Sequence, residues 1–286
     1  MLYRRSIGAI ALLAALGTTM TGTRAWDETK YPDLNGQWVR AEGARGVGRF
    51  DPTKGPGRLQ EAPLTAEYQA IYEANLKDQA EGGQGVDPTY RCLSPGMPRI
   101  MHAYSPVEFV VTPNTTHILI EHIHDSRRIH TDGRDWPADM DDNPMFRGYS
   151  IGQWIDEDGD GRYDVLDVET RGPFRGPRAY DPSGLPLHFD NMSIFKERIF
   201  LDKTDPNTLH NVMTVIDRAL TRPWTVDKRY RRNPNAQPQW SEYYCGENNA
   251  QIVIGKENYF LADGYLMPVR KGQKPPDLRY FDATTR

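Results

Sequence analysis

The sequence predicts a mainly β protein: an antiparallel, lipocalin-like β-barrel with one N-terminal amphipathic helix. From residue 107 onward, apolar residues recur with a period of two, which indicates half-buried strands. These strands are short and closely spaced, which favours antiparallel pairing because parallel strands need long crossovers. A single helix cannot cover the resulting sheet, so we expect the sheet to close into a barrel, with a β-sandwich as the alternative.

Residues 1–25 have the pattern of an export signal. Arg4 and Arg5 form its basic start, and residues 7–17 form its apolar stretch. Residues 23–25 end in a small-residue cleavage pattern. The apolar stretch is too short for a spanning helix, and no later segment is long and apolar enough. We therefore expect a periplasmic or secreted protein without a transmembrane segment after signal removal; general and twin-arginine export both stay open.

Residues 26–286 are expected to form one β-rich domain, with an irregular N-terminal segment 26–106 and a C-terminal tail 263–286. The irregular segment contains the expected helix, residues 65–83, for which Thr65 is a suitable N-cap. Its apolar side chains recur at helical spacing, and we expect this stripe to pack on the core. The stripe consists of Leu64, Tyr68, Ile71, Tyr72 and Leu76.

A first strand is expected after the turn at Asn35-Gly36. Turn residues such as Pro113-Asn114 separate the later strands. Those strands are expected at residues 107–112, 116–124, 127–131, 148–155, 164–170, 191–201, 208–217, 224–231, 240–245, 251–255 and 258–262.

The charge of the chain argues against a nucleic-acid partner. The sequence has 35 basic and 39 acidic residues and a formal charge of −4. Three of the basic residues and none of the acidic ones lie in the expected signal, which leaves 32 against 39 and a net charge of −7. Non-specific binding of nucleic acid needs a positive surface, so we expect no such partner.

Cys92 and Cys245 are the two cysteines of the chain. In an oxidising compartment an even number of cysteines favours a disulfide. We therefore expect a Cys92–Cys245 bond that ties the two ends of the domain together, with two separate buried thiols as the alternative.

The segment DEDGDGRYD, residues 156–164, has the pattern of a calcium loop. Its alternating carboxylates can converge on one cation, its glycines allow a tight turn, and oxygen ligands at this density suit Ca²⁺. The predicted ligands are Asp156, Asp158, Asp160, the carbonyl of Arg162, Asp164, and Asp167 at the twelfth position. Strand-like flanks suggest a structural calcium ion that fastens a hairpin; a solvated acidic tip without a cation is the alternative.

The densest group of polar side chains lies in residues 116–134. If Asp125-Ser126 is a two-residue hairpin turn, Glu121 faces His130 across the strands, with Arg128 diagonal to both. A carboxylate that orients an imidazole beside an arginine is a workable acid–base site if it is enclosed. Glu121, Arg128 and His130 are therefore candidate catalytic residues, which His188 could join; an ordinary polar network is the alternative.

Two functions follow from this reading. The first is an exported barrel that binds a small, partly apolar molecule in its mouth or interior. The second is an enzyme of the same fold that performs hydrolysis, elimination or isomerisation, with His130 as base, Glu121 as its orienting group and Arg128 as the stabiliser of negative charge. No nucleophile elbow, zinc helix, phosphate loop or dinucleotide motif occurs in the sequence, and this favours binding.

Six segments resemble a widespread family of exported, uncharacterised, β-rich bacterial proteins. The segments are RRIHTDGRDWP (127–137), GYSIGQW (148–154), VLDVET (165–170), KERI (196–199), LTRPWTV (220–226) and EYYCGENN (242–249). The resemblance covers residues 30–262. The 148–170 hairpin is longer here than in the commoner form of the family, so the calcium-type loop resembles an elaboration. The resemblance implies kinship and export, and it implies no particular reaction or ligand.

Overall fold

The computed structural model describes residues 26–41, 48–83, 85–102, 106–121 and 125–240, together with the backbone of residues 251–254, 257–262 and 265–269. The expected export signal, residues 1–25, lies outside the described residues, and so does Cys245. Within the described part of the chain, no helix is long and apolar enough to cross a membrane.

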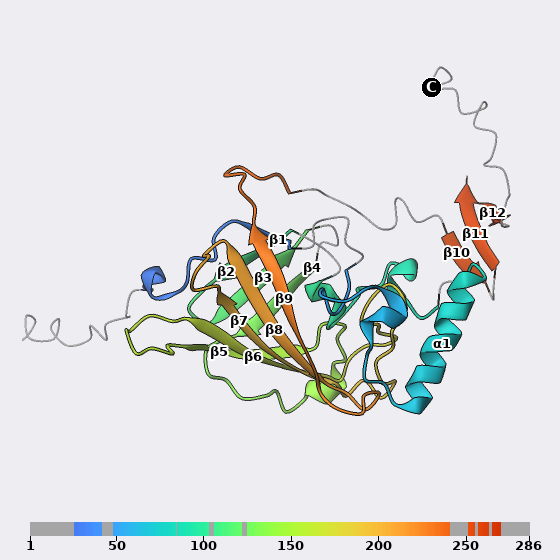
Figure 1. Cartoon of the computed structure of the whole chain (residues 1–286), viewed down its shortest axis with the longest axis horizontal. Coiled ribbons are helices and arrows are strands. Elements are labelled where there is room, and N and C mark those ends of the chain that lie inside the picture. Colours follow the sequence, from blue (N-terminus) through green and yellow to red (C-terminus); the bar gives the residue numbers. More distant parts are fainter. Residues whose placement is uncertain are drawn as a thin grey trace, which may run out of the picture.

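Nine strands form a closed barrel in which strands that follow one another in the chain lie side by side (Figure 1). The barrel closes where the first strand pairs with the ninth. The strands are β1 (Gln37–Arg40), β2 (Val107–Val111), β3 (Thr115–Ile120), β4 (Asp125–His130), β5 (Tyr149–Ile155), β6 (Val165–Arg171), β7 (Ile194–Leu201), β8 (Thr208–Ile216) and β9 (Trp224–Arg232). The predicted mainly β barrel is therefore confirmed, and the β-sandwich is not the fold.

One pair of neighbouring strands departs from the expected antiparallel pattern. Strands β4 and β5 run parallel, with Ile129 opposite Ser150, and residues 131–148 form the long connection between them. If all neighbours in a nine-stranded barrel were antiparallel, the first and last strands would point in the same direction. The single parallel step lets β1 and β9 pair antiparallel, which is how the barrel closes.

The described interior of the barrel is filled with side chains. Apolar residues alternate along the strands and point inward, as the period of two predicts. Trp38, Ile118, Phe195 and Met213, from four different strands, are completely buried. Residues from outside the barrel continue the same core at one end of it, namely Phe50, Met97, Ile100, Tyr180 and Leu185. Side chains therefore occupy the described interior, which is one of the two places, mouth or interior, that the sequence suggested for a ligand.

The single α-helix of the described residues, α1 (Ala66–Ala80), confirms the predicted helix. The Thr65 hydroxyl caps it by accepting a hydrogen bond from the Tyr68 N–H at 3.4 Å, and Tyr68 and Tyr72 lie on its buried face. The Tyr72 hydroxyl bonds to Ser183 at 2.8 Å, and burial raises the pKa of Tyr72 to about 12. Short 3-10 helices occur at Glu28–Lys30, Gly57–Gln60, Pro88–Arg91, Arg99–Met101 and Met140–Asp142.

The last three strands form a separate antiparallel sheet: β10 (Gln251–Ile254), β11 (Glu257–Ala262) and β12 (Tyr265–Val269). The sequence placed the first two of these segments among the strands of the barrel and assigned residues 263–286 to a tail. The first expectation is corrected, because the barrel is already closed by β1 and β9. Strand β12 lies within the residues assigned to the tail.

Candidate functional site

The β3–β4 hairpin has a different register from the predicted one. His130 pairs with Thr115, six positions away from its predicted partner Glu121. Six residues of strand correspond to about 20 Å. Asp125 belongs to β4 and not to the turn, so the predicted Glu121–His130 pair is wrong.

The two faces of this hairpin are also assigned differently. Arg127 and Ile118 point into the barrel and are almost completely buried, so the enclosed face is theirs and not that of the candidate residues Arg128 and His130. Arg128 is exposed, and His130 is half-buried on the outer face. The His130 ring stacks on Tyr149 with its centroid 4.8 Å away. Partial burial, followed by the charge of Arg134, lowers the pKa of His130.

The other two candidate catalytic residues lie apart from Arg128 and His130. Glu121 is buried just beyond the end of β3. The His188 ring stacks between Tyr68 and Phe189, with centroids 5.1 Å and 4.5 Å away, in a loop beside α1. The structure therefore keeps Arg128 and His130 together on the outer face of β4 but brings neither Glu121 nor His188 to them, and Asp190 is the acidic neighbour of His188, at 3.0 Å.

The inside of the barrel holds a polar network that the sequence analysis missed. Nη1 of Arg127 donates to Oε1 of Glu197 at 3.0 Å, and Nη2 donates to Oε2 of the same carboxylate. The guanidinium also donates to Thr170 at 2.7 Å and to Ser150 at 3.2 Å. Asn211 donates its amide to Oε1 of Glu197 at 2.9 Å. All five side chains are buried, so the network is enclosed and has a structural role.

A signal for this network was present in the sequence. Glu197 lies between Phe195 and Ile199 in the alternating pattern of β7, and both apolar neighbours are buried. Arg127 shares a face with Ile129 in the same way. A charged residue at an inward position needs a partner of opposite charge. The sequence does not show which inward-facing residue of another strand forms this pair.

The loop between β5 and β6 brings three carboxylates together. One oxygen each of Asp156, Asp158 and Asp164 lies within 4.8 Å of the others. The Asp156 carboxylate accepts hydrogen bonds from the backbone N–H groups of Gly159, at 2.7 Å, and Gly161, at 2.9 Å. Both glycines have positive φ angles, 77° and 87°, which confirms the predicted tight turn. This arrangement of oxygens can take a hard cation.

Two of the other predicted calcium ligands lie outside this group of three carboxylates. Asp160 accepts a hydrogen bond from the backbone N–H of Arg162 at 2.8 Å. Asp167 lies within β6, where its carboxylate is 3.3 Å from Nε of Arg198. Because Asp167 points to the outer face of the sheet, its assignment as the twelfth-position ligand is corrected.

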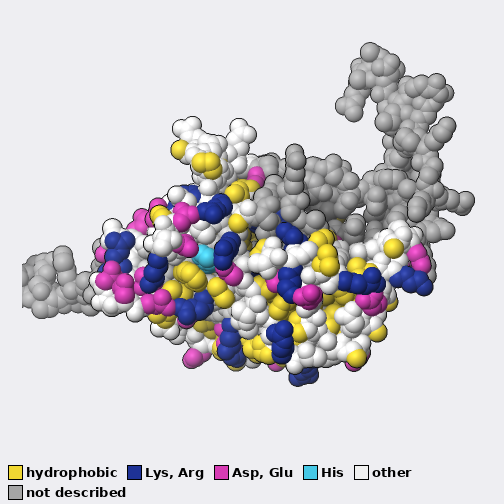
Figure 2. Space-filling view, viewed as in Figure 1, with side chains coloured by type: hydrophobic (Ala, Val, Ile, Leu, Met, Phe, Trp, Pro, Cys, Tyr) yellow, Lys and Arg dark blue, Asp and Glu magenta, His cyan; other side chains and the backbone are white. Residues whose placement is uncertain are grey.

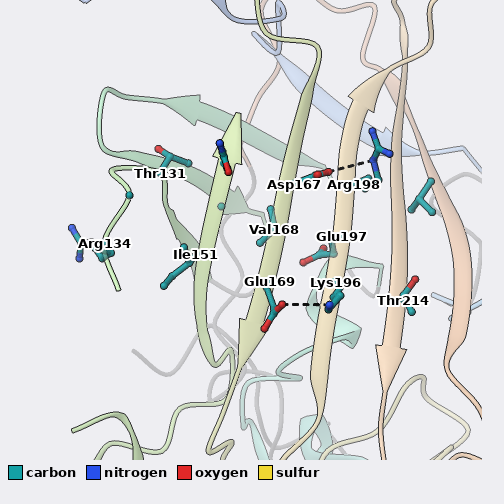
Figure 3. A pocket seen from close by; sticks show the side chains of 14 residues that line it. Thr131, Arg134, Ile151, Asp167, Val168, Glu169, Lys196, Glu197, Arg198 and Thr214 are labelled. Carbon is teal, nitrogen blue, oxygen red and sulfur yellow. Dashed lines mark ion pairs between the residues drawn. The ribbon is translucent and has the colours of Figure 1, made fainter. Parts of the chain in front are cut away.

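A groove of about 870 Å³ covers the outer face of β5–β8 (Figure 3). Its floor consists of two rows of outward side chains that follow the strand register. One row is Ile151, Glu169, Lys196 and Thr214, and the other is Gln153, Asp167, Arg198 and Val212. Thr131, Gly133 and Arg134, which follow β4, line one side. The groove thus combines apolar, hydroxyl and charged groups on a rigid sheet.

The charges in the groove are paired across β6 and β7, and two of them also have a partner outside the groove: Arg171 donates to Glu169, and Arg198 donates to Glu157. Lys196 lies 3.7 Å from Glu169, and Arg198 lies 3.3 Å from Asp167. The Lys196 and Arg198 side chains are 57% and 50% exposed, so solvent screens both pairs. Exposed pairs of this kind contribute about 0–1 kcal/mol each, and a bound molecule can therefore separate them at little cost.

Most of the groove comes from the segments that carry the family resemblance. Every lining residue except Val212 and Thr214 belongs to 127–137, 148–154, 165–170 or 196–199. Four segments that are far apart in the sequence therefore meet at one surface. In comparisons with known proteins, no family model matches the chain and no curated protein matches it. The geometry of the groove is accordingly the basis for a functional assignment.

Proposed function

We propose that the protein is an exported binding protein that takes a small, partly apolar molecule into the groove on β5–β8. The groove itself is the observation that carries this proposal. Its volume of about 870 Å³ lies within the range of roughly 300–1,000 Å³ that is usual for small-molecule sites. It replaces the barrel interior as the binding place, because buried side chains occupy the described interior.

Binding is favoured over catalysis by the placement of the candidate residues. Enzyme chemistry at Glu121, Arg128 and His130 required these groups to line one pocket, and the register of the hairpin separates them. The groove contains carboxylates, amines and hydroxyls suited to orienting a ligand.

The proposal includes three further elements from the sequence. The compartment is the periplasm or the exterior, and the expected signal supports this. A calcium ion fastens the β5–β6 loop, which the convergence of Asp156, Asp158 and Asp164 supports. Nucleic acid is not a partner: in Figure 2 basic and acidic side chains intermingle over the described surface of the face shown, and the net charge is negative.

The test is capture of a ligand from a small-molecule cell extract by the purified protein, followed by mass spectrometry. The variant Val212→Trp fills the groove from β8. The control, Val110→Trp, makes the same substitution at an exposed position of β2, a strand that does not line the groove. We expect at least one compound to be enriched by the wild type and by the control and lost from Val212→Trp. Equal enrichment by all three proteins would contradict the proposal.

A further inference from the structure

The floor of the groove is divided into chemically distinct strips, one on each strand. Strand β6 presents two carboxylates, Asp167 and Glu169, and β7 presents two cations, Lys196 and Arg198. Ile151 of β5 lies opposite Glu169. Figure 3 shows the acidic and basic side chains facing each other in two adjacent pairs. Across the sheet, the floor therefore begins with an apolar group and continues with an acid and then a base.

The far side of the groove adds a second apolar group. Val212 of β8 lies opposite Arg198. Neighbouring strands are about 4.8 Å apart, so the strips cover about 14 Å from β5 to β8. Along the diagonal from Ile151 through Glu169 and Arg198 to Val212 the order is apolar, acidic, basic, apolar, whereas Gln153 and Thr214 are the polar ends of the two rows. This diagonal is the mirror of a ligand with an apolar group, an ammonium, a carboxylate and a second apolar group.

We propose, building on the function proposed above, that the ligand is a short zwitterionic peptide of two or three residues with apolar side chains. Its ammonium lies on the acidic strip of β6, and its carboxylate lies on the basic strip of β7. One side chain covers Ile151 and the other covers Val212.

The dimensions of a dipeptide agree with this arrangement. Two residues of extended chain cover at most about 7 Å, and the acidic and basic strips are one strand spacing, about 4.8 Å, apart. The ligand exchanges weak protein–protein ion pairs for protein–ligand pairs of the same kind. Recognition therefore requires both charges together, because a ligand with one charge leaves the opposite strip without a new partner.

The first experiment compares four probes by titration calorimetry: Leu-Leu, N-acetyl-Leu-Leu, Leu-Leu amide and Gly-Gly. Acetylation removes the ammonium, amidation removes the carboxylate, and Gly-Gly lacks both side chains. We expect Leu-Leu to bind at least fivefold more tightly than either blocked form and at least tenfold more tightly than Gly-Gly. Equal affinity of Leu-Leu and its acetylated form would overturn the proposal in favour of a simple apolar acid.

The second experiment locates the carboxylate. Lys196→Gln should weaken Leu-Leu and N-acetyl-Leu-Leu and leave Leu-Leu amide unchanged. Lys203→Gln, at an exposed position between β7 and β8, is the matched control and should change none of them. Loss of affinity for all three ligands alike, or for none, contradicts the assignment.

The two proposals fail in different ways. If Val212→Trp abolishes capture of a compound from the extract but Leu-Leu does not bind, the groove is a binding site and the peptide is wrong. If Leu-Leu binds and Val212→Trp does not weaken it, the peptide site lies elsewhere and the inference fails. If neither the extract nor the probes depend on the groove, the proposed function fails as well.

Discussion

Arg127 of β4 and Glu197 of β7 meet inside the barrel, and both oxygens of the Glu197 carboxylate accept hydrogen bonds from the Arg127 guanidinium. The two side chains are 1% and 0% exposed. Their strands are not neighbours, since β5 and β6 lie between them on one side. The pair therefore connects two strands that are three places apart in the wall of the barrel.

Glu197→Gln is expected to destabilise the protein strongly. The substitution keeps the shape of the side chain and leaves the Arg127 guanidinium buried without a counter-charge. Breaking a buried pair in this way costs about 3–5 kcal/mol. Urea unfolding, followed by circular dichroism, measures the change. Glu169→Gln, on the outer face of the neighbouring strand β6, is the matched control and should change the free energy of unfolding by less than about 1 kcal/mol.

The double variant Arg127→Met with Glu197→Leu separates the contribution of charge to the free energy of unfolding from the contribution of packing. Because it removes both charges, it should be more stable than Glu197→Gln by about 2 kcal/mol or more. It is not expected to equal the wild type, since Asn211 then loses the acceptor of its amide. A double variant as unstable as the single one would show that the pair contributes through packing alone.

The barrel could be predicted because its signal is local: the period of two and the spacing of turns appear within short windows. The β3–β4 hairpin shows that such local signals do not determine the register between two strands. The predicted turn at Asp125-Ser126 and the observed register differ by an even number of residues, so each strand keeps its division into two faces while every cross-strand partner changes. The apolar residues Ile118 and Ile129 identify the face of the hairpin that is buried. Burial of apolar side chains decides which face points into the barrel, and the reactive groups on the face of His130 do not.

The groove could not be predicted because it depends on which strands are neighbours. Asp167 looked like a calcium ligand when it was counted along the loop, yet its pairing with Arg198 depends on β7 lying beside β6. The loop itself was predictable, since its carboxylates and glycines lie within nine consecutive residues. Sites made of consecutive residues are visible in a sequence, whereas sites made across strands require the register.

Acid should destabilise the fold through His102. This imidazole is completely buried, and burial, followed by the charges of Lys228 and Arg99, holds its pKa well below the usual 6.5. Below pH 6.5 the unfolded chain takes up a proton at this position and the folded protein does not. The stabilisation is therefore complete above pH 6.5 and is lost as the pH falls below it, with a slope of at most about 1.4 kcal/mol per pH unit.

Urea unfolding at pH 8, 7, 6 and 5 checks this expectation. His102→Gln, whose amide can replace the contact of His102 with the Tyr180 carbonyl, should reduce the slope between pH 7 and pH 5. His130→Gln should reduce it less, because burial lowers the pKa of the partly exposed His130 to a smaller degree. An unchanged slope in His102→Gln would contradict the assignment.

The expected Cys92–Cys245 disulfide stays a prediction, since Cys245 lies outside the described residues. A bond that closes a loop of this length stabilises the fold by about 3–5 kcal/mol in the chain-entropy model. Unfolded, non-reduced protein should therefore contain no thiol that reacts with Ellman's reagent. Cys92→Ser, Cys245→Ser and the double variant should be equally destabilised. If the double variant were clearly less stable than either single one, the cysteines would contribute separately, as two buried thiols.

Calcium should raise the melting temperature, because a ligand that binds only the folded state stabilises it. At a concentration one hundred times its Kd the gain is about 2.7 kcal/mol. Asp156→Asn and Asp164→Asn each remove a carboxylate from the group of three and should abolish most of the shift. Asp160→Asn lies in the same loop but outside that group, so it should keep more of the shift. Magnesium, which demands near-octahedral geometry, should raise the melting temperature less. If calcium does not change the melting temperature and mass analysis finds no bound calcium, the loop is an acidic turn without a cation.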